Sequence, residues 1–391
     1  MENKKHILFI SSWYPNRHDP THGIFNQQFA QAATIYNKIS VLHVCSDADL
    51  TSGFEYVETS DNGFETLIVY YKKIESIFPF ISQLKKRRQI IRAFEYGYQK
   101  LVAKTGAPDL IQLNVILPAG IGVLHLSEKY NIPFVINEGW TGYTPEDGNY
   151  KGFAQKFYTQ KIVAKAKAIM PVSEHLKKAM LAHQLSGNYF IVPNVVDINF
   201  FTPKSSPAEN EIKYLHISSL DDPQKNVSGI IRAFFEAQKI IPGMELNIVG
   251  DGEDRAMLQD LVAELKLDPK VNFKGYLLGV DLVNEINASH AIVMFSNYET
   301  FCLAVVEALA CGKPVIASRA GGVTSQITPE LGISLNSKDE KALTAALINF
   351  AANYKNYDSK RIRQFVIENF SKEIIASKLE EVYNFALSKN N

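Results

Sequence analysis

The stretch "ETFCLAVVEALACGKPVIASRAGG", Glu299–Gly322, decides how this chain folds. Apart from Glu307, residues 301–310 are apolar on nearly every helical face, which predicts a buried helix. Gly312 suits the position after a helix end, and Pro314 blocks continuation of the helix. "AIVMFSNYE" before the helix contains a buried strand, and "PVIAS" after it is another. The stretch therefore predicts one strand–helix–strand unit of a parallel sheet.

Short apolar segments alternate with helix-length amphipathic segments along the whole chain, a rhythm that predicts βαβ units. In the first half, strands are predicted at HILFIS, SVLHVC, TLIVYY, DLIQLN, PFVIN, AIMPVS and YFIVPN, and helices over 25–36 and 176–182. The second half gives strands at IKYLHIS, ELNIVG, VNFKG, AIVMFS and PVIAS. We therefore expect an α/β fold with two Rossmann-like, doubly wound parallel-sheet domains that face each other across a cleft.

A segment rich in Pro, Ser and Asn, "PNVVDINFFTPKSSPAEN", separates the two series and is typical of a linker. We place an N-terminal Rossmann-like domain at 1–197 and a C-terminal Rossmann-like domain at 198–370. The last segment, 371–391, is predicted to hold a helix that crosses back to the N-terminal domain.

Composition narrows the class of protein. Among 391 residues, 46% are hydrophobic and 21% charged, which fits a soluble globular chain. The 41 basic and 41 acidic residues cancel, so the balance does not indicate a nucleic-acid partner. The three cysteines lack CxxC spacing, which favours a reducing, cytoplasmic setting. The N-terminal apolar run is predicted to be a strand, and the longest apolar segment is shorter than the roughly 20 residues that cross a bilayer.

Two glutamates interrupt the apolar stretch. Glu299 precedes a helix N-terminus whose free backbone N–H groups, at Phe301, Cys302 and Leu303, form a ready anion site. Glu307 lies about two turns further on, roughly 9 to 12 Å along the axis. Two carboxylates would repel a lone phosphate, but they fit hydroxyl groups on either side of it, as in a nucleotide-diphosphate sugar. The alternative is that Glu299 caps the helix and Glu307 pairs with a buried Arg or Lys.

With the seven residues between them, these glutamates resemble the E-x7-E signature of the family-4 retaining glycosyltransferases with the GT-B fold, the glycosyl transferases group 1. The likeness extends through SSWYPNRHDPTHGIF, NEGWTGY, VPNVVD, HISSLDDPQKN, NIVGDGED and EALACGKPVIASRAGG, of which the last is the most specific. It implies a nucleotide-diphosphate sugar donor in the C-terminal domain and an acceptor in the N-terminal domain. It also implies transfer with retention of configuration, without a metal ion or cofactor.

Carried over by position, the resemblance assigns roles. Glu299 would contact hydroxyls of the donor sugar, Glu307 the ribose, and the amides of residues 301–303 the diphosphate. Lys225 would neutralise the departing phosphate, so Lys225 and Glu299 are the implied catalytic residues. Gly23 would let backbone approach the donor or acceptor closely. The alternatives are a solvated Lys225 and a Gly23 that only serves a turn before the following helix.

Two positions depart from the family pattern. Ser219 stands where an arginine usually partners the lysine, and Gly139 stands where a histidine usually faces the donor sugar. A lost charged hydrogen bond typically costs about 1.5 to 3 kcal/mol. The segment NEGWTGY follows a strand end, so Glu138, Trp140 and Tyr143 are the acceptor-side candidates, with loop packing as the alternative.

Possible metal ligands carry less weight. Asp47-Ala-Asp49 is a literal DxD, the metal-binding signature of a different transferase fold, but three residues occur easily by chance. Pro20 excludes a regular helix that would present the nearby ligand-type residues on one face, which are His18, Asp19 and His22. We therefore predict no metal site.

Two further signals are also weak. "IVGDGED" lacks the third glycine of GxGxxG, which disfavours a dinucleotide cofactor. Cys302 at a helix N-terminus could be reactive, but small-residue packing is favoured because no base partner is apparent.

The sequence thus predicts a retaining hexosyltransferase-type enzyme of surface polysaccharide or glycoconjugate assembly, acting on a glycan or lipid-linked acceptor. Two alternatives remain open, namely a nucleotide-sugar epimerase or hydrolase of the same fold, and a non-catalytic nucleotide-sugar-binding scaffold.

One helix raises the question of a membrane. In segment 78–101, apolar residues recur at helical spacing beside the basic run Lys85–Arg88, and they are Leu84, Ile91, Phe94, Tyr98 and Leu101. Such a helix can lie on anionic lipid, with a wedge formed by Phe78, Phe80 and Ile81, at the inner face of the membrane. The favoured interpretation is an ordinary helix that packs its apolar stripe on the first domain.

Overall fold

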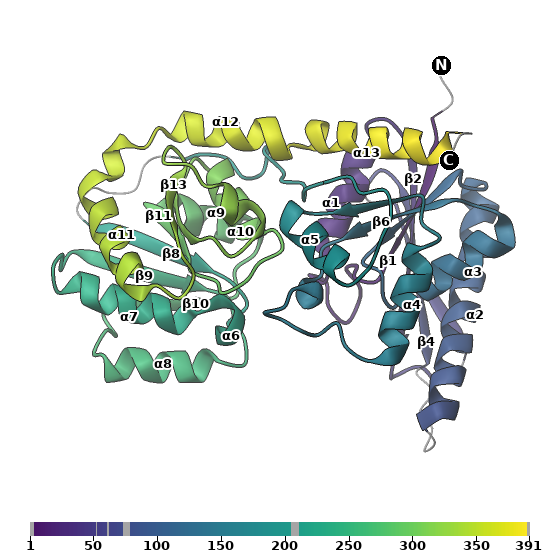
Figure 1. Ribbon diagram of the computed structural model, residues 1–391, viewed down its shortest axis with the longest axis horizontal. Helices are drawn as coiled ribbons and strands as arrows, with labels where there is room; N and C mark the ends of the chain where they lie inside the picture. The colour runs from purple at the N-terminus through teal and green to yellow at the C-terminus, as the bar shows by residue number, and fades with distance from the viewer. Residues whose placement is uncertain (1–3, 52, 61, 73–78, 205–210, 389–391) are drawn as a thin grey trace. The chain divides into compact units, whose positions relative to one another are not determined.

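The computed structural model describes residues 4–51, 53–60, 62–72, 79–204 and 211–388 (Figure 1). The chain divides into two compact units. Unit 1 comprises 1–143, 148–195 and 372–391, and unit 2 comprises 144–147 and 196–371. Each unit is built on a largely or wholly parallel sheet, which confirms the expected fold class of two Rossmann-like domains.

The sheet of unit 1 has the strand order β3-β4-β2-β1-β5-β6-β7. Its strands are β1 (His6–Ser11), β2 (Lys38–Asp47), β3 (Phe54–Thr59), β4 (Glu65–Lys72), β5 (Leu110–Asn114), β6 (Phe134–Glu138) and β7 (Ala168–Pro171). All neighbours are parallel except β3, which pairs antiparallel with β4. The central strand β1 is buried on both faces, as a sheet covered by helices on both sides requires.

Helices cover both faces of this sheet. They are α1 (Ile24–Ala33), α2 (Pro79–Thr105), α3 (Gly120–Tyr130), α4 (Phe153–Val163), α5 (Glu174–Ala182) and α13 (Lys372–Leu387), with a 3₁₀ turn, η1 (Thr141–Tyr143). Successive residues of β2 point to opposite faces. Val41 joins the core formed with α1 and α13, whereas Leu42 packs against Gly97 of α2.

The sheet of unit 2 is wholly parallel, in the order β10-β9-β8-β11-β12-β13. Its strands are β8 (Ile212–Ile217), β9 (Met244–Val249), β10 (Val271–Gly275), β11 (Ala291–Met294), β12 (Val315–Ser318) and β13 (Gly332–Leu335). Its helices are α6 (Asp222–Lys225), α7 (Val227–Gln238), α8 (Arg255–Glu264), α9 (Gly279–Ala288), α10 (Leu303–Ala310), α11 (Glu340–Asn353) and α12 (Ser359–Phe370), with 3₁₀ turns η2 (Gly322–Gln326) and η3 (Tyr354–Asn356).

The helix predicted from the opening stretch is α10, and it is buried as expected. Gly312 has φ 70° and follows the C-cap Cys311. The amide of Gly312 donates to Leu309 O and that of Lys313 to Ala308 O, so the helix ends in a Schellman motif. The predicted strand on each side is present as β11 and β12, which pair in parallel.

One strand prediction was wrong, and two strands were not predicted. The segment YFIVPN is not a strand: it runs beside β7 with one isolated bridge, Ile169 to Tyr189. Pro171 at the end of β7 and Pro193 have no N–H with which to continue a ladder there. Strand β3 was missed because its side chains after Phe54 are exposed, so no buried face marks the sequence. Strand β13, a four-residue edge strand, was missed as well.

The last helix, α13, belongs to unit 1. It packs on α1 and β6, where its buried side chains join the core that also contains Phe29 and Val41. Glu380 accepts hydrogen bonds from Lys5 and, at 3.1 Å, from Asn37 Nδ2, and the Tyr383 hydroxyl donates to Gln112. Both apolar and polar contacts therefore fix this helix to the first unit.

Candidate functional site

In unit 2 the direction of strand order reverses between β8 and β11. In doubly wound sheets, ligands bind outside the carboxyl ends of the strands at such a switch point. The loop after β8 leads to Lys225 and the loop after β11 leads to Glu299, so the two residues approach each other although they lie far apart in the sequence.

Lys225 and Glu299 form a buried ion pair. Lys225 Nζ donates to Glu299 Oε1 at 2.7 Å, and Ser296 Oγ donates to the same oxygen at 2.9 Å. The side chains are 14% and 6% exposed, respectively. Burial lowers the pKa of Lys225, but the Glu299 carboxylate outweighs it and raises the pKa above the ordinary value. Lys225 therefore carries its charge at the switch point, with two N–H groups left to meet an anion.

Backbone and amide contacts hold the two loops together. Asn297 N donates to Gln224 O at 2.8 Å, and Asn297 Nδ2 donates to Pro223 O at 2.9 Å. Glu299 N donates to Ala320 O at 2.7 Å, which ties this loop to the end of β12 as well. The carboxylate is thus placed by three segments of chain rather than by one flexible loop.

The start of α10 differs from the prediction by two residues. The helix begins at Leu303, and Cys302 is its N-cap in the left-handed conformation, with φ 73°. Among the described residues, the amides of Phe301, Cys302 and Leu303 have no acceptor in the protein. Gly322 sits so close that a Cβ there would lie 2.4 Å from Phe301 Cα. The close packing of Gly322 on Phe301 supports the left-handed backbone of the neighbouring residue, Cys302. Residues that carry a side chain rarely adopt this conformation, and those that do are often found at binding sites.

Glu299 does not cap α10, since the N-cap Cys302 has no side-chain cap bond and the Glu299 carboxylate contacts Lys225 instead. Glu307 is half-buried in the helix and has no Arg or Lys partner within the described residues. Burial raises the pKa of Glu307 to about 7. The alternative interpretation of two structural glutamates, a cap and a buried pair, is therefore wrong in both parts.

Burial also raises the pKa of the Cys302 thiol, although the residue precedes a helix. Desolvation of the thiolate outweighs any benefit from the helix N-terminus, so Cys302 is a packing residue, as favoured from the sequence. Ser219, where the family pattern has arginine, is exposed on the loop after β8. Lys225 is the cation that contacts Glu299.

In unit 1 the strand order reverses between β1 and β5, and a cavity of about 250 Å³ lies beside the loops that follow these strands. The lining combines three predicted acceptor-side residues with five others, and the full set is Trp13, Val115, Leu117, Glu138, Trp140, Tyr143, Gln155 and Thr159. The sequence did not single out Gln155 and Thr159, since nothing local marks which face of α4 borders a cavity. Trp13 belonged to a quoted motif without a role.

The Glu138 carboxylate holds together the loops that line this cavity. Its carboxylate accepts hydrogen bonds from the amides of Ile116 at 3.0 Å and of Gly139 and Trp140 at 2.9 Å, and from the Tyr143 hydroxyl at 3.4 Å. Burial raises the pKa of Glu138, while these donors oppose the shift. The carboxylate thereby joins the loop after β5 to the loop after β6. A Cβ on Gly139 would have ordinary contacts only, so the position has room for a side chain.

Strained backbone marks the same edge. Val115, a β-branched residue, has φ 61°, and it is held there by its amide, which donates to Asn137 O at 2.8 Å, and by Ser12 Oγ, which donates to Val115 O at 2.7 Å. Gly23 has φ 70° as the N-cap of α1, and a Cβ there would lie 2.5 Å from Trp13 O. Gly23 therefore allows the two ends of the first loop, residues 12–23 between β1 and α1, to pass close to each other.

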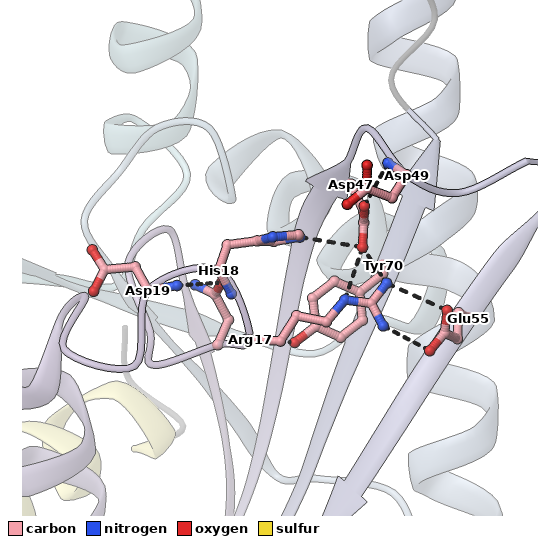
Figure 2. A network of polar contacts seen from close by, with 8 residues as sticks. Arg17, His18, Asp19, Asp47, Asp49, Glu55 and Tyr70 are labelled. Atoms are coloured by element: carbon pink, nitrogen blue, oxygen red, sulfur yellow. Dashed lines mark hydrogen bonds and ion pairs between the residues drawn. The ribbon is translucent and has the colours of Figure 1, made fainter.

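The DxD residue Asp47 belongs to a network of polar contacts that pins this first loop to the sheet (Figure 2). Arg17 Nε donates to Asp47 at 2.8 Å, and Arg17 Nη1 donates to Glu55 at 2.7 Å. The guanidinium lies 3.9 Å from the Tyr70 ring centre, and His18 Nε2 is 3.2 Å from Asp47. Asp47 is thus engaged by basic side chains. Within the described ranges, no three His, Cys or acidic side chains gather as they would around a metal ion.

Comparison with known proteins agrees with this geometry. Residues 197–366 match the model of the family described as glycosyl transferases group 1. Unit 2 is a group 1 glycosyl transferase domain. The match covers the Lys225–Glu299 pair and all of α10.

Relatives of this group 1 domain carry several transferase activities. The chain is 29% identical over 205 residues to MMP alpha-(1->4)-mannosyltransferase of Mycolicibacterium hassiacum, covering 51% of this chain and 49% of that protein. It is 30% identical to N-acetyl-alpha-D-glucosaminyl L-malate synthase of Bacillus anthracis, covering 45% and 46%. It is 28% identical to glycogen synthase of Mycobacterium tuberculosis, covering 46% and 43%. The chain thus aligns with about half the length of these relatives or less.

Solved structures match over nearly the whole chain and establish the GT-B fold. Sucrose-phosphate synthase from Thermosynechococcus elongatus has a TM-score of 0.77 at 22% identity, covering 98% of this chain and 100% of that one. Anabaena HepE, solved in complex with UDP, has a TM-score of 0.73 at 17% identity, covering 97% and 99%. The fold around the group 1 domain is therefore shared beyond the segment that the family model matches.

Proposed function

We propose that this protein transfers a sugar, with retention of configuration, from a nucleotide-diphosphate donor bound by unit 2 to an acceptor bound by unit 1. The observation that carries this proposal is the buried Lys225–Glu299 pair beside three amides without acceptors, at the switch point of a group 1 domain. The cation and the amides match a diphosphate, and the free oxygen of Glu299 matches a sugar hydroxyl.

In the reaction, the bond between the anomeric carbon and the diphosphate oxygen breaks, and a bond from the acceptor hydroxyl oxygen to that carbon forms on the same face. The acceptor proton passes to the departing phosphate. Lys225 and the amides at the start of α10 stabilise the negative charge that develops on the diphosphate. The lysine supplies a positive charge and the amides supply N–H donors at this position, so we propose a reaction that needs no metal ion. Glu307, half-buried in α10, accepts from the ribose hydroxyls.

The acceptor is proposed to occupy the cavity of unit 1, with Trp140 as a wall and Glu138 as the residue that positions it. Helix α4, which lines this cavity through Gln155 and Thr159, also exposes Phe153 (86% exposed) and Phe157 (50% exposed). The two rings stack with centroids 6.1 Å apart. Exposed aromatic rings beside basic residues favour contact with the interface between a membrane and water, which suits a lipid-linked glycan acceptor.

The basic run of α2 lies close to this aromatic surface. Arg87 Nη1 donates to the Tyr158 hydroxyl at 3.0 Å, and Lys85 and Arg88 are exposed. The expected wedge of Phe78, Phe80 and Ile81 lies outside the residues whose side chains the structure describes, as does Leu84. Phe94, Tyr98 and Leu101 are buried in unit 1. No helix in the described part of the chain is long and apolar enough to span a bilayer. We propose peripheral contact with an anionic membrane.

A thermal-shift screen against UDP-, GDP- and ADP-sugars tests the proposal, because a ligand that binds only the folded state raises the apparent stability. We expect one nucleotide class to raise Tm and Lys225→Ala to abolish that rise. With the donor so identified, NMR of an early product from an α-linked donor should show an α linkage. A β linkage would overturn retention, and a lack of response to every donor would overturn the proposed donor site.

A further inference from the structure

A second polar cavity lies at the opposite edge of the unit 2 sheet. Its volume is about 290 Å³. It is bordered by the turns that lead into β11 and β12 and by the segment from η3 to the start of α12, and its lining is Lys204, His290, Cys311, Gly312, Lys313, Pro314, Tyr354, Lys355, Tyr357 and Ser359. Lys225 and Glu299 follow the carboxyl ends of strands, whereas this lining precedes the amino ends, so the cavity is separate from the donor site.

The lining is cationic. Three lysines contribute to it and no carboxylate does, while His290 adds a ring that burial keeps neutral by lowering its pKa to about 4. Lys313 is only 8% exposed, and its Nζ donates to Asn287 O at 2.7 Å, which leaves two of its three N–H groups for another acceptor. Burial lowers the pKa of Lys313 to about 8, because no acidic side chain among the described residues offsets the desolvation. A buried ammonium without a counter-charge is a costly arrangement unless a ligand supplies that charge.

His290 adds a donor without an acceptor. The residue is 5% exposed, and the Lys213 amide donates to its Nδ1 at 3.1 Å. Nδ1 therefore accepts, which puts the ring proton on Nε2. Nε2 is buried and has no hydrogen-bond partner within the described chain. A buried polar donor without a partner costs free energy comparable to a lost hydrogen bond.

The negative end of α10 does not cancel this positive field. The carbonyls of Ala308 and Leu309 accept from the Lys313 and Gly312 amides, and Ala310 O accepts from Arg363 Nη1 at 2.5 Å. The last turn of the helix is therefore satisfied internally. The rings of Tyr354 and Tyr357 also line the cavity, so it has apolar surface that could contact a small carbon skeleton attached to an anion.

We propose that this cavity binds a phosphoryl anion, with Lys313 and His290 Nε2 as the buried donors and Lys204 and Lys355 at the rim. Phosphate oxygens accept several charge-assisted hydrogen bonds at once, which matches a lining that offers donors and no acidic group. The ligand is either inorganic phosphate or a small phosphate monoester, both of which present this group. The inference concerns the amino edge of the sheet and does not depend on the transfer reaction.

Calorimetric titration of the full chain with inorganic phosphate, and separately with glycerol phosphate, tests the site at constant ionic strength set by chloride. We expect binding by the wild type and a loss of ~tenfold or more in affinity for Lys313→Met, as one charged hydrogen bond would give. Lys239→Met, which removes an exposed lysine of unit 2 outside the cavity lining, is the matched control and should retain binding. Lys225→Met reports any phosphate that binds at the proposed donor site instead. Tighter binding of the ester identifies a phosphate ester as the ligand, and equal binding identifies free phosphate.

A second pair of measurements guards against a folding defect in Lys313→Met. Lys204 and Lys355 are exposed, so the double variant Lys204→Gln/Lys355→Gln should fold and still bind phosphate several-fold more weakly. In ¹⁵N NMR of the histidine rings, phosphate should shift the His290 Nε2 resonance in the wild type. The proposal is overturned if phosphate does not bind, if chloride competes as well as phosphate, or if only Lys225→Met abolishes binding.

Discussion

Lys225 and Glu299 are both buried, and the charge of each neutralises that of the other. Breaking a buried ion pair by removing one partner typically costs about 3 to 5 kcal/mol, since the remaining charge stays desolvated. A loss of activity in such a variant therefore mixes stability with chemistry. Glu307 carries no such complication, because it has no ionic partner among the described side chains.

The two glutamates should differ in the ligand that they recognise. Glu299→Ala should weaken binding of the nucleotide sugar relative to the free nucleotide, because its free oxygen is proposed to accept from the sugar. Glu307→Ala should lower the affinity for both the nucleotide sugar and the free nucleotide by about tenfold or more, as the loss of a charged hydrogen bond predicts. Calorimetry with both ligands measures the difference.

Glu264→Ala, an exposed glutamate at the end of α8, is the matched control and should bind both ligands as the wild type does. Glu299→Gln, which keeps an oxygen for Lys225, separates the binding effect from loss of the ion pair. Wild-type affinity of both glutamate variants for both ligands would refute the assigned roles.

Glu307 should also make nucleotide affinity depend on pH. In the free protein burial raises its pKa to about 7, so much of the carboxyl is protonated below that pH. The ribose hydroxyls would hydrogen-bond the ionised form, which lowers the pKa in the complex. Binding must therefore release a proton below about pH 7, and affinity should rise with pH from about 5.5 and level off above about 7.

The measurement is calorimetry at several pH values with wild type and Glu307→Gln. The variant keeps an acceptor oxygen but cannot titrate, so any pH dependence that remains in it comes from the nucleotide phosphates. Identical slopes in the two proteins would mean that Glu307 does not face the ribose.

At the scale of elements, α10 and α13 have different roles. Helix α10 presents its amides at the carboxyl edge of unit 2, and its left-handed N-cap is held by the contact between Gly322 and Phe301. Helix α13 is the last element of the chain, yet it packs in the core of unit 1. Unit 1 is therefore complete only when the far end of the chain has returned to it.

Leu379→Ala should destabilise unit 1. Leu379 is fully buried in the core that α13 shares with α1, and a Leu→Ala change in a core typically costs about 2 to 5 kcal/mol. The protein's two tryptophans, Trp13 and Trp140, both lie in unit 1, so their fluorescence reports the unfolding of that unit in urea. The midpoint should fall to a lower urea concentration.

Lys378→Ala, one residue away and exposed, is the control and should leave the midpoint nearly unchanged. A Leu379→Ala midpoint equal to that of the control would show that unit 1 does not depend on α13.

At the scale of the whole molecule, the basic and acidic residues balance, but the basic side chains are not evenly distributed. The formal net charge is zero, but basic side chains gather on α2 beside the exposed aromatic rings of α4. Each Lys or Arg near an anionic membrane surface contributes about 1 kcal/mol of attraction, and salt screens it.

The protein should therefore sediment with liposomes that contain anionic lipid at low salt. Changing Lys85, Lys86, Arg87 and Arg88 to Glu should release it, and so should high salt. A control with the same change in net charge reverses the exposed lysines of unit 2, which are Lys266, Lys338, Lys341 and Lys360, and it should still sediment. Absence of binding at low salt, or equal release of both variants, would place the acceptor in solution.

The sequence by itself determined the α/β class and the elements with a strong local period. The apolar run of α10, its terminating Gly312 and the strands on either side are local patterns, so they could be read directly. The motif Glu299–Glu307 also indicated the family, because both residues lie within one strand–helix segment. The exposed strand β3 had no buried face to read, and YFIVPN had strand-like residues but prolines that interrupt pairing.

Only the tertiary structure decided which residues meet. It joins Lys225 to Glu299 across the switch point, gives Glu138 its backbone donors from two loops, and brings α13 to the first unit. It also gathers Lys313, His290 and the η3 segment around a cavity that no local pattern marks. Such contacts arise from strand order, because parallel neighbours bring together loops that are distant in the sequence. Periodicity reports the burial of a residue within its own element and contains no information about its partner in another.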